Sequence, residues 1–145
     1  SLQKDVDQFF LKDGWVEHDA YSIWKDVKKL IKEILKKNNI TSSQILSIGI
    51  SNQRETTVLW DKTNGIPVNK AIVWQDRRTI DICKKLRDQK LEKKIQKITG
   101  LIIDPYFSAT KIKWILDNNP LAKRLIEKKK LLFAGIIRAN KKVDW

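Results

Sequence analysis

Two short apolar runs with a charged pair between them constrain the fold of this chain most strongly. The first run, Gln44 to Ser51, is rich in isoleucine and predicts a buried strand. The second run, Thr56 to Trp60, predicts another strand, but Arg54 and Glu55 stand directly before it. A fixed cation beside an anion does not fit the middle of a buried sheet. We therefore interpret this pair as lying at a strand end, where side chains meet solvent or a ligand.

Helical periodicity surrounds these strands. Apolar residues at three- and four-residue spacings from Ile23 to Leu35 predict an amphipathic helix, with Asp19 or Ser22 as its N-terminal cap and Asn38-Asn39 at its end. Four further helices are predicted. Residues 75–78 lead into one that ends at about Gln89, and the next covers 91–98 before Gly100. The other two cover 109–118, with Ser108 as cap, and Pro120 to about Lys130.

Two more strands complete the predicted elements. The turn 61–65 ends in Asn-Gly and leads to a strand over 71–74, which would complete a three-stranded meander. The run LLFAGII, 131–137, predicts a last strand. The order of helix, three strands, helices and strand is typical of an α/β fold, with no repeat, linker or domain boundary.

Composition limits the classes of function. The formal net charge of +13 invites nucleic-acid binding. The excess is mostly lysine scattered along helical polar faces, so we favour solvated helix faces over nucleic-acid binding. One cysteine, Cys83, excludes an internal disulfide framework, and one histidine, His18, cannot anchor a typical zinc site alone. Cys83 lies among apolar residues at near-helical spacing, which predicts a packed thiol.

Membrane and phosphate-loop signals are absent from the sequence. No apolar stretch is long enough to span a bilayer, and the first residues lack the apolar centre of a signal peptide, so we expect a cytoplasmic protein with no membrane partner. The sequence contains no GxxxxGK[ST] or GxGxxG loop that would hold the phosphates of ATP.

Polar groups at three expected strand ends or loop mouths suggest a ligand class. These groups are Arg54-Glu55, residues 74–78 and residues 104–106. A guanidinium and a carboxylate bond hydroxyls, and Trp or Tyr covers C–H surface, so the set suits a small polyol. Each residue taken singly also has a structural interpretation. Arg54 and Glu55 could form surface ion pairs, residues 76–78 could begin a helix, and Tyr106 could be a core aromatic.

Four motifs follow one another in a fixed order: GWVEHD at 14–19, NQRETT at 52–57, AIVWQDRRT at 71–79 and DPYFSATK at 104–111. Together they resemble the glycerol kinases of the FGGY sugar-kinase family, from about Phe9 to Phe133. The resemblance implies an α/β chain that forms part of a ribonuclease H-like, actin-like ATPase domain. Such a domain has a mixed sheet with flanking helices, and this chain is expected to lack the first β-hairpin of the fold.

The resemblance also implies an activity: ATP-dependent phosphorylation of glycerol to glycerol 3-phosphate, with Mg²⁺. By the same resemblance, Arg54 and Glu55 are expected to hydrogen-bond the glycerol hydroxyls. Tyr106 is expected to add a third contact and Trp74 an aromatic wall. The family's phosphate loop belongs to the hairpin expected before Ser1, and its aspartate base to segments beyond residue 145. We therefore expect no catalytic, cofactor-binding or metal-binding residue within this chain.

The expected organisation is one partial domain over residues 1–145, with a divergent tail at 134–145, that is inactive alone. Two alternatives remain open at this stage. One is a non-catalytic remnant or binding fragment that associates with a partner supplying the rest of the fold. The other, less favoured, is a basic nucleic-acid-binding domain. Homo-oligomerisation is left open by the sequence.

Overall fold

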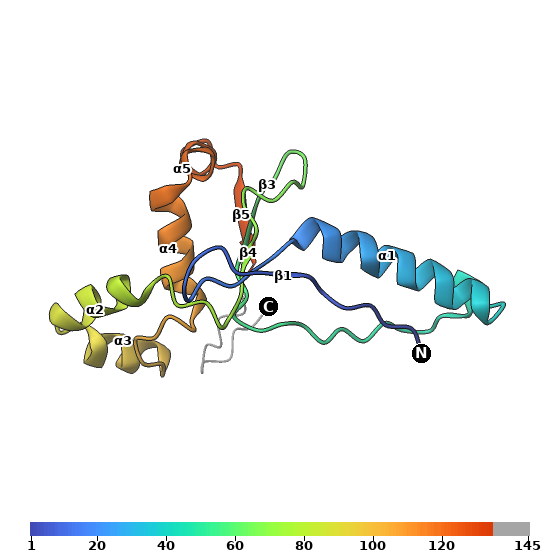
Figure 1. Ribbon diagram of the computed structural model, residues 1–145, viewed down its shortest axis with the longest axis horizontal. Helices are drawn as coiled ribbons and strands as arrows, with labels where there is room; N and C mark the ends of the chain where they lie inside the picture. Colours follow the sequence, from blue (N-terminus) through green and yellow to red (C-terminus); the bar gives the residue numbers. More distant parts are fainter. Residues whose placement is uncertain (135–145) are drawn as a thin grey trace.

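The computed structural model describes residues 1–134 (Figure 1). A long helix, α1, projects to one side, and two short helices, α2 and α3, lie on the opposite side. Between them, α4 and α5 stand beside paired strands. The end of the predicted last strand and nearly all of the predicted divergent tail, residues 135–145, lie outside the described residues.

Helix α1, Ala20–Lys37, forms as its periodicity predicts. The Asp19 carboxylate accepts hydrogen bonds from the backbone N–H groups of Tyr21 and Ser22 and so satisfies two donors that the first turn leaves unpaired. Lys36 and Lys37 lie in the last turn, where the helix dipole favours positive charge. No residue of α1 is buried, so its apolar stripe is partly exposed.

The strands form two small sheets in place of the predicted three-stranded meander. In the first sheet β2 (Glu17–His18) lies between β1 (Gln8–Phe9) and β4 (Ala71–Ile72), and both pairings are antiparallel. In the second, β3 (Val58–Asp61) pairs antiparallel with β5 (Leu131–Ala134). The meander prediction was wrong because β3 and β4 take partners from distant parts of the chain. The two strands are not paired with each other; one isolated bridge joins Thr57, just before β3, to Ile72 of β4.

The strand predicted for Gln44 to Ser51 is also absent. A short 3₁₀ helix, η1 (Ser42–Gln44), leads into an irregular segment in which Leu46 is 99% exposed, Ile48 77% and Ile50 87%. A strand needs a neighbour for its backbone N–H and C=O groups. No segment of residues 1–134 pairs with 45–51, so this run stays extended and exposed.

The helices of the second half form close to their predicted positions. They are α2 (Ile80–Asp88), α3 (Glu92–Thr99), α4 (Ser108–Asn118) and α5 (Pro120–Glu127). Gly100 ends α3 with a left-handed φ of 75°, and Asn119 caps α5. Cys83 is buried in α2, as its spacing predicts.

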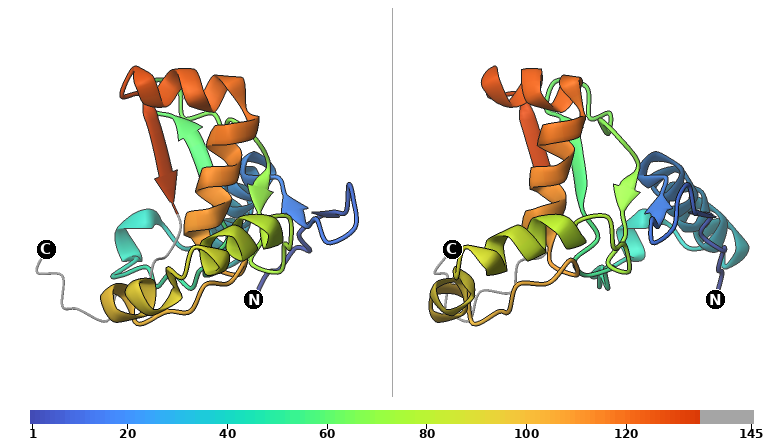
Figure 2. Two further views of the ribbon diagram at one scale, coloured as in Figure 1. Left: turned by 90° about the vertical axis from the view of Figure 1, so that its left-hand side faces the viewer. Right: turned by 60° about the vertical axis from the view of Figure 1, so that its left-hand side comes forward.

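The core lies where the second pair of helices meets the strands. Figure 2 shows α4 beside β3 and β5, with α5 across their ends. Leu59, Ile72, Ile115 and Ala122 come from β3, β4, α4 and α5, and all four are fully buried. This core fixes the strand ends next to which the candidate site residues lie.

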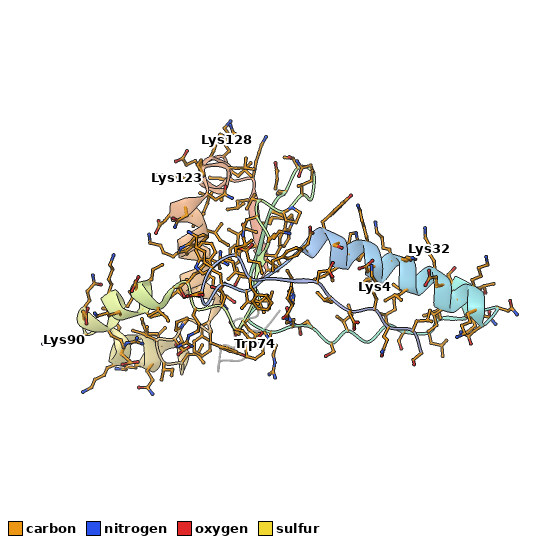
Figure 3. The ribbon with its side chains drawn as sticks, in the orientation of Figure 1. Lys4, Lys32, Trp74, Lys90, Lys123 and Lys128 are labelled. Atoms are coloured by element: carbon orange, nitrogen blue, oxygen red, sulfur yellow. The ribbon has the colours of Figure 1, made fainter. Side chains whose placement is uncertain are left out.

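The positive charge is spread around the periphery. Figure 3 labels Lys32 on α1, Lys90 at the turn between α2 and α3, and Lys123 and Lys128 at α5, all at outer ends of the molecule. Such spacing agrees with solvated helix faces. No helix within residues 1–134 is long and apolar enough to cross a membrane.

Candidate functional site

Three loops bring predicted site residues together around one surface hollow. Arg54, Trp74 and Tyr106 line a hollow of about 320 Å³, together with Asn52 and Gln53. The rings of Trp74 and Tyr106 meet edge to face, with centroids 6.1 Å apart, and Trp74 remains 40% exposed. These residues are 20 and 32 positions apart in sequence, so the fold and not local spacing creates the cluster.

Hydrogen bonds tie the first two loops together. The backbone N–H of Trp74 donates to the Thr56 hydroxyl over 3.3 Å, and that hydroxyl donates to the Gln53 side-chain carbonyl over 2.9 Å. Thr57 and Ile72 exchange two backbone hydrogen bonds of 2.8 and 3.0 Å directly behind them. The spacing between the Arg54 loop and Trp74 is therefore set by short, directional bonds.

Glu55 does not line this hollow. It is 4% exposed, has a left-handed φ of 61°, and borders a neighbouring apolar cavity of about 140 Å³. No ion pair of residues 1–134 involves Glu55 or Arg54, so the structural interpretation of the pair as surface salt bridges was wrong. Arg54 faces the hollow and Glu55 enters the protein interior, so the structure places the two neighbours in different surroundings.

The Glu55 carboxylate binds the start of α4. Its Oε2 accepts from the backbone N–H of Ser108 over 3.1 Å and from the Ser108 hydroxyl over 2.9 Å. The prediction that Ser108 caps α4 was wrong, because Ser108 is already the first residue of the helix and its hydroxyl bonds Glu55 instead. A carboxylate at a helix N-terminus is favoured by both the free N–H groups and the helix dipole.

Lys111, which sequence analysis missed, completes this network. Its side chain is fully buried, and Nζ donates to the backbone carbonyls of Glu55 over 2.9 Å and of Tyr106 over 2.6 Å. Burial lowers the pKa of Lys111 to about 8, and nearby carboxylates, Glu55 foremost, oppose that shift. A lysine four residues before the buried Ile115, on the same helix face, was the signal available in the sequence.

A second buried network supports the loop that carries Trp74. The Arg78 guanidinium bonds Asp76 Oδ1 over 2.9 Å and Oδ2 over 2.8 Å, and it lies 2.8 Å from Glu17 Oε1. The Cζ atom of the Arg78 guanidinium also lies 3.8 Å from the centroid of the Trp15 ring, in cation–π contact. Helix α2 begins at Ile80, two positions after Arg78, so the interpretation of residues 76–78 as a helix start was wrong. They join the loop after β4 to the segment that enters β2.

The described residues carry no cluster of metal-binding side chains. Residues 1–134 contain no group of three His, Cys, Asp or Glu side chains that could hold a metal ion. Asp76 and Glu17 are both engaged by Arg78. The hollow offers a guanidinium, two amides and two aromatic rings, groups that can bond hydroxyls and cover C–H surface.

This mixed helix-and-strand chain belongs to the FGGY family of carbohydrate kinases, whose N-terminal domain model matches residues 1–138. It is 54% identical over 136 residues to a glycerol kinase of Treponema denticola, covering 94% of this chain and 27% of the relative. It is 52% identical over 136 residues to a glycerol kinase of Bacillus subtilis, with the same shares covered. The chain thus spans 27% of the length of these relatives and is a fragment by comparison with them.

Solved structures agree with this assignment. The structure is similar to that of Plasmodium falciparum glycerol kinase with ADP, with a TM-score of 0.85 and 38% identity over 91% of this chain and 26% of that one. A gluconate kinase from Lactobacillus acidophilus, 20% identical with a TM-score of 0.72 over 91% of this chain and 25% of that one, shares the fold. The expected partial actin-like ATPase domain of strands and flanking helices is confirmed. Every strand pairing within residues 1–134 is antiparallel, so the expected mixed sheet is not seen there. Membership of a kinase family implies the use of ATP.

Proposed function

We propose that this chain supplies the glycerol-binding part of a kinase that transfers the γ-phosphoryl group of Mg-ATP to a terminal hydroxyl of glycerol. The observation that carries the proposal is the convergence of Arg54, Trp74 and Tyr106 on one hollow. The identity of 54% to a relative named glycerol kinase supports the choice of glycerol among polyols.

In this proposal each side chain has a defined role. The Arg54 guanidinium donates hydrogen bonds to two glycerol oxygens, and the Trp74 ring covers the carbon chain. The Tyr106 hydroxyl adds a third polar contact. Glu55, which the resemblance places on a glycerol hydroxyl, does not line the hollow, so in this proposal it holds the start of α4 through Ser108 and makes no direct contact with glycerol.

Orientation is the contribution that this set can make to catalysis. Phosphoryl transfer depends on alignment and charge stabilisation more than on covalent help, so a polyol held by three directional contacts is presented in one pose. Because this chain covers 27% of a glycerol kinase relative and its described residues hold no cluster of metal ligands, we expect it by itself to form no glycerol 3-phosphate from glycerol and ATP.

Titration of the isotope-labelled chain with glycerol tests the binding role directly. The Trp74 indole and Arg54 side-chain NMR signals are expected to shift with glycerol and to shift less with propan-1-ol, which lacks two of the three hydroxyls. Arg54→Ala is expected to abolish the glycerol-dependent shift of Trp74. The matched control, Arg124→Ala, removes an exposed arginine on α5 and is expected to change nothing. Equal responses of the two variants would contradict the proposal.

A second candidate function, association with another polypeptide, is favoured by one observation. Leu46, Ile48 and Ile50 are all more than three quarters exposed, with 77% the smallest value, in a segment that forms no strand. Size-exclusion chromatography separates the candidates, because a concentration-independent monomer that binds glycerol argues against this second role.

A further inference from the structure

We propose that Lys111 is a positioning residue that holds the loop of Arg54 and Glu55 in register with the loop of Tyr106, on opposite sides of the polyol hollow. The inference rests on the proposed function, because it concerns the same hollow. One ammonium group donates to the backbone carbonyls of both residues, over 2.9 and 2.6 Å. Those carbonyls belong to two loops that are 51 positions apart, so Lys111 joins the polar side of the hollow to its aromatic side.

The burial of Lys111 makes these bonds persistent. The side chain has no exposed surface, so water does not compete for its three donors. Glu55, Asp76 and Asp104 face the ammonium with negative charge, and Arg78 faces it with positive charge. A buried ammonium is retained only where carbonyls and carboxylates surround it. The two loops therefore fix the position of the Lys111 ammonium, and the ammonium in turn fixes the positions of the two loops.

Glu55 needs such support because of its backbone. Its φ of 61° is left-handed, which is unfavourable for a residue with a Cβ. The Lys111 bond to its carbonyl and the Ser108 bonds to its carboxylate hold Glu55 from both ends. When these bonds are removed, Glu55 is free to return to an ordinary conformation and to redirect Arg54, its neighbour in the chain.

Lys111→Met tests the proposal because methionine keeps the length of the side chain and removes all three donors. The matched control is Lys113→Met on the same helix, where the ammonium is exposed and pairs with Asp117. In Lys111→Met we expect the NOEs between the Trp74 and Tyr106 rings to be lost and glycerol affinity to fall at least about tenfold, which corresponds to about 1.4 kcal/mol of binding free energy. Retention of both ring contacts and affinity would refute the proposal.

A measurement on the wild-type chain keeps the proposal testable if Lys111→Met does not fold. The chain has two tyrosines, so labelling with [1-¹³C]tyrosine gives two carbonyl signals, from Tyr106 and from Tyr21 on α1. Loss of the ammonium charge as pH rises is expected to move the Tyr106 signal with a midpoint near pH 8, the pKa of Lys111. The Tyr21 signal, which is remote from any buried lysine, is expected to stay still. A Tyr106 carbonyl that does not titrate refutes the proposal.

These readouts separate the two hypotheses. If the wild-type chain does not bind glycerol but the Tyr106 carbonyl titrates and the ring contacts depend on Lys111, the positioning role stands and the proposed substrate fails. If glycerol binds and is unaffected by Lys111→Met in a folded variant, the substrate stands and the positioning role fails. Ser108→Ala gives an independent check, because it removes the hydroxyl bond to Glu55 and leaves the backbone N–H bond of residue 108 and every charged group in place; we expect a smaller loss of affinity in the same direction.

Discussion

Replacement of Asp76 by alanine should destabilise the fold severely. Asp76 is 1% exposed and accepts from the backbone N–H of Val16 over 2.7 Å, from the backbone N–H of Arg78 over 2.9 Å and from two guanidinium nitrogens. Breaking a buried ion pair by removing one partner typically costs about 3–5 kcal/mol. Glu17 still neutralises part of the Arg78 charge, whereas the Val16 N–H loses its acceptor. We therefore expect Asp76→Ala to lower the free energy of unfolding by about 4 kcal/mol in total.

Urea denaturation followed by tryptophan fluorescence measures this loss. For a small domain the free energy of unfolding falls by about 1–3 kcal/mol per molar urea, so the expected loss lowers the midpoint by about 2 M. The control is Asp117→Ala, which removes one half of an exposed ion pair with Lys113, and it should cost less than about 1 kcal/mol. A loss below about 1 kcal/mol for Asp76→Ala would refute the argument, because it would mean that the Arg78 network adds no net stability.

Two further predictions concern pH and backbone geometry. Burial lowers the pKa of His18 below 6.5, so the unfolded chain takes up a proton first as pH falls, and the free energy of unfolding should decline below pH 6.5. Calorimetry should show this decline in the wild type and a shallower one in His18→Gln; identical slopes would count against it. Gly100→Ala should lower stability by about 1 kcal/mol because φ is 75° there, whereas Gly49→Ala, at a site with open space and no positive φ, should not. Thermal unfolding of the two variants measures the difference, and equal melting temperatures would contradict it.

The helices were largely predictable from the sequence because their signals are local. Asp19, Gly100 and Pro120 mark helix ends by the conformations and hydrogen bonds that these residues favour, and α1, α3 and α5 begin or end beside them. Strand pairing was not predictable in this way. β4 pairs with β2 across more than fifty residues, and the most strand-like run, 44–51, finds no partner within residues 1–134. Pairing is a property of two segments, and periodicity describes only one.

In the candidate site, too, the residue types were predictable from the sequence and the long-range contacts were not. The residue types at Arg54, Trp74 and Tyr106 indicated a polyol, and the structure brings these three side chains together. The supporting bonds were not visible in the sequence, because Ser108 and Lys111 reach Glu55 across 53 and 56 positions. A serine beside a helix start suggests a cap, and only the folded chain shows that a distant carboxylate receives its hydroxyl.

The isolation of α1 has a consequence for motion within the native state. This helix of 18 residues has no buried residue and is held by the Asp19 cap, the bonds of its own backbone and two ion pairs, Lys29 with Glu33 at 3.7 Å and Lys4 with Asp26 at 2.6 Å. Helix α4, in contrast, buries Ser108, Thr110, Lys111 and Ile115. Amide hydrogens of α1 should therefore exchange with deuterium through local opening of the helix, whereas those of α4 should exchange only through global unfolding. The long arm of the molecule and its centre are expected to behave as two cooperative units with different lifetimes.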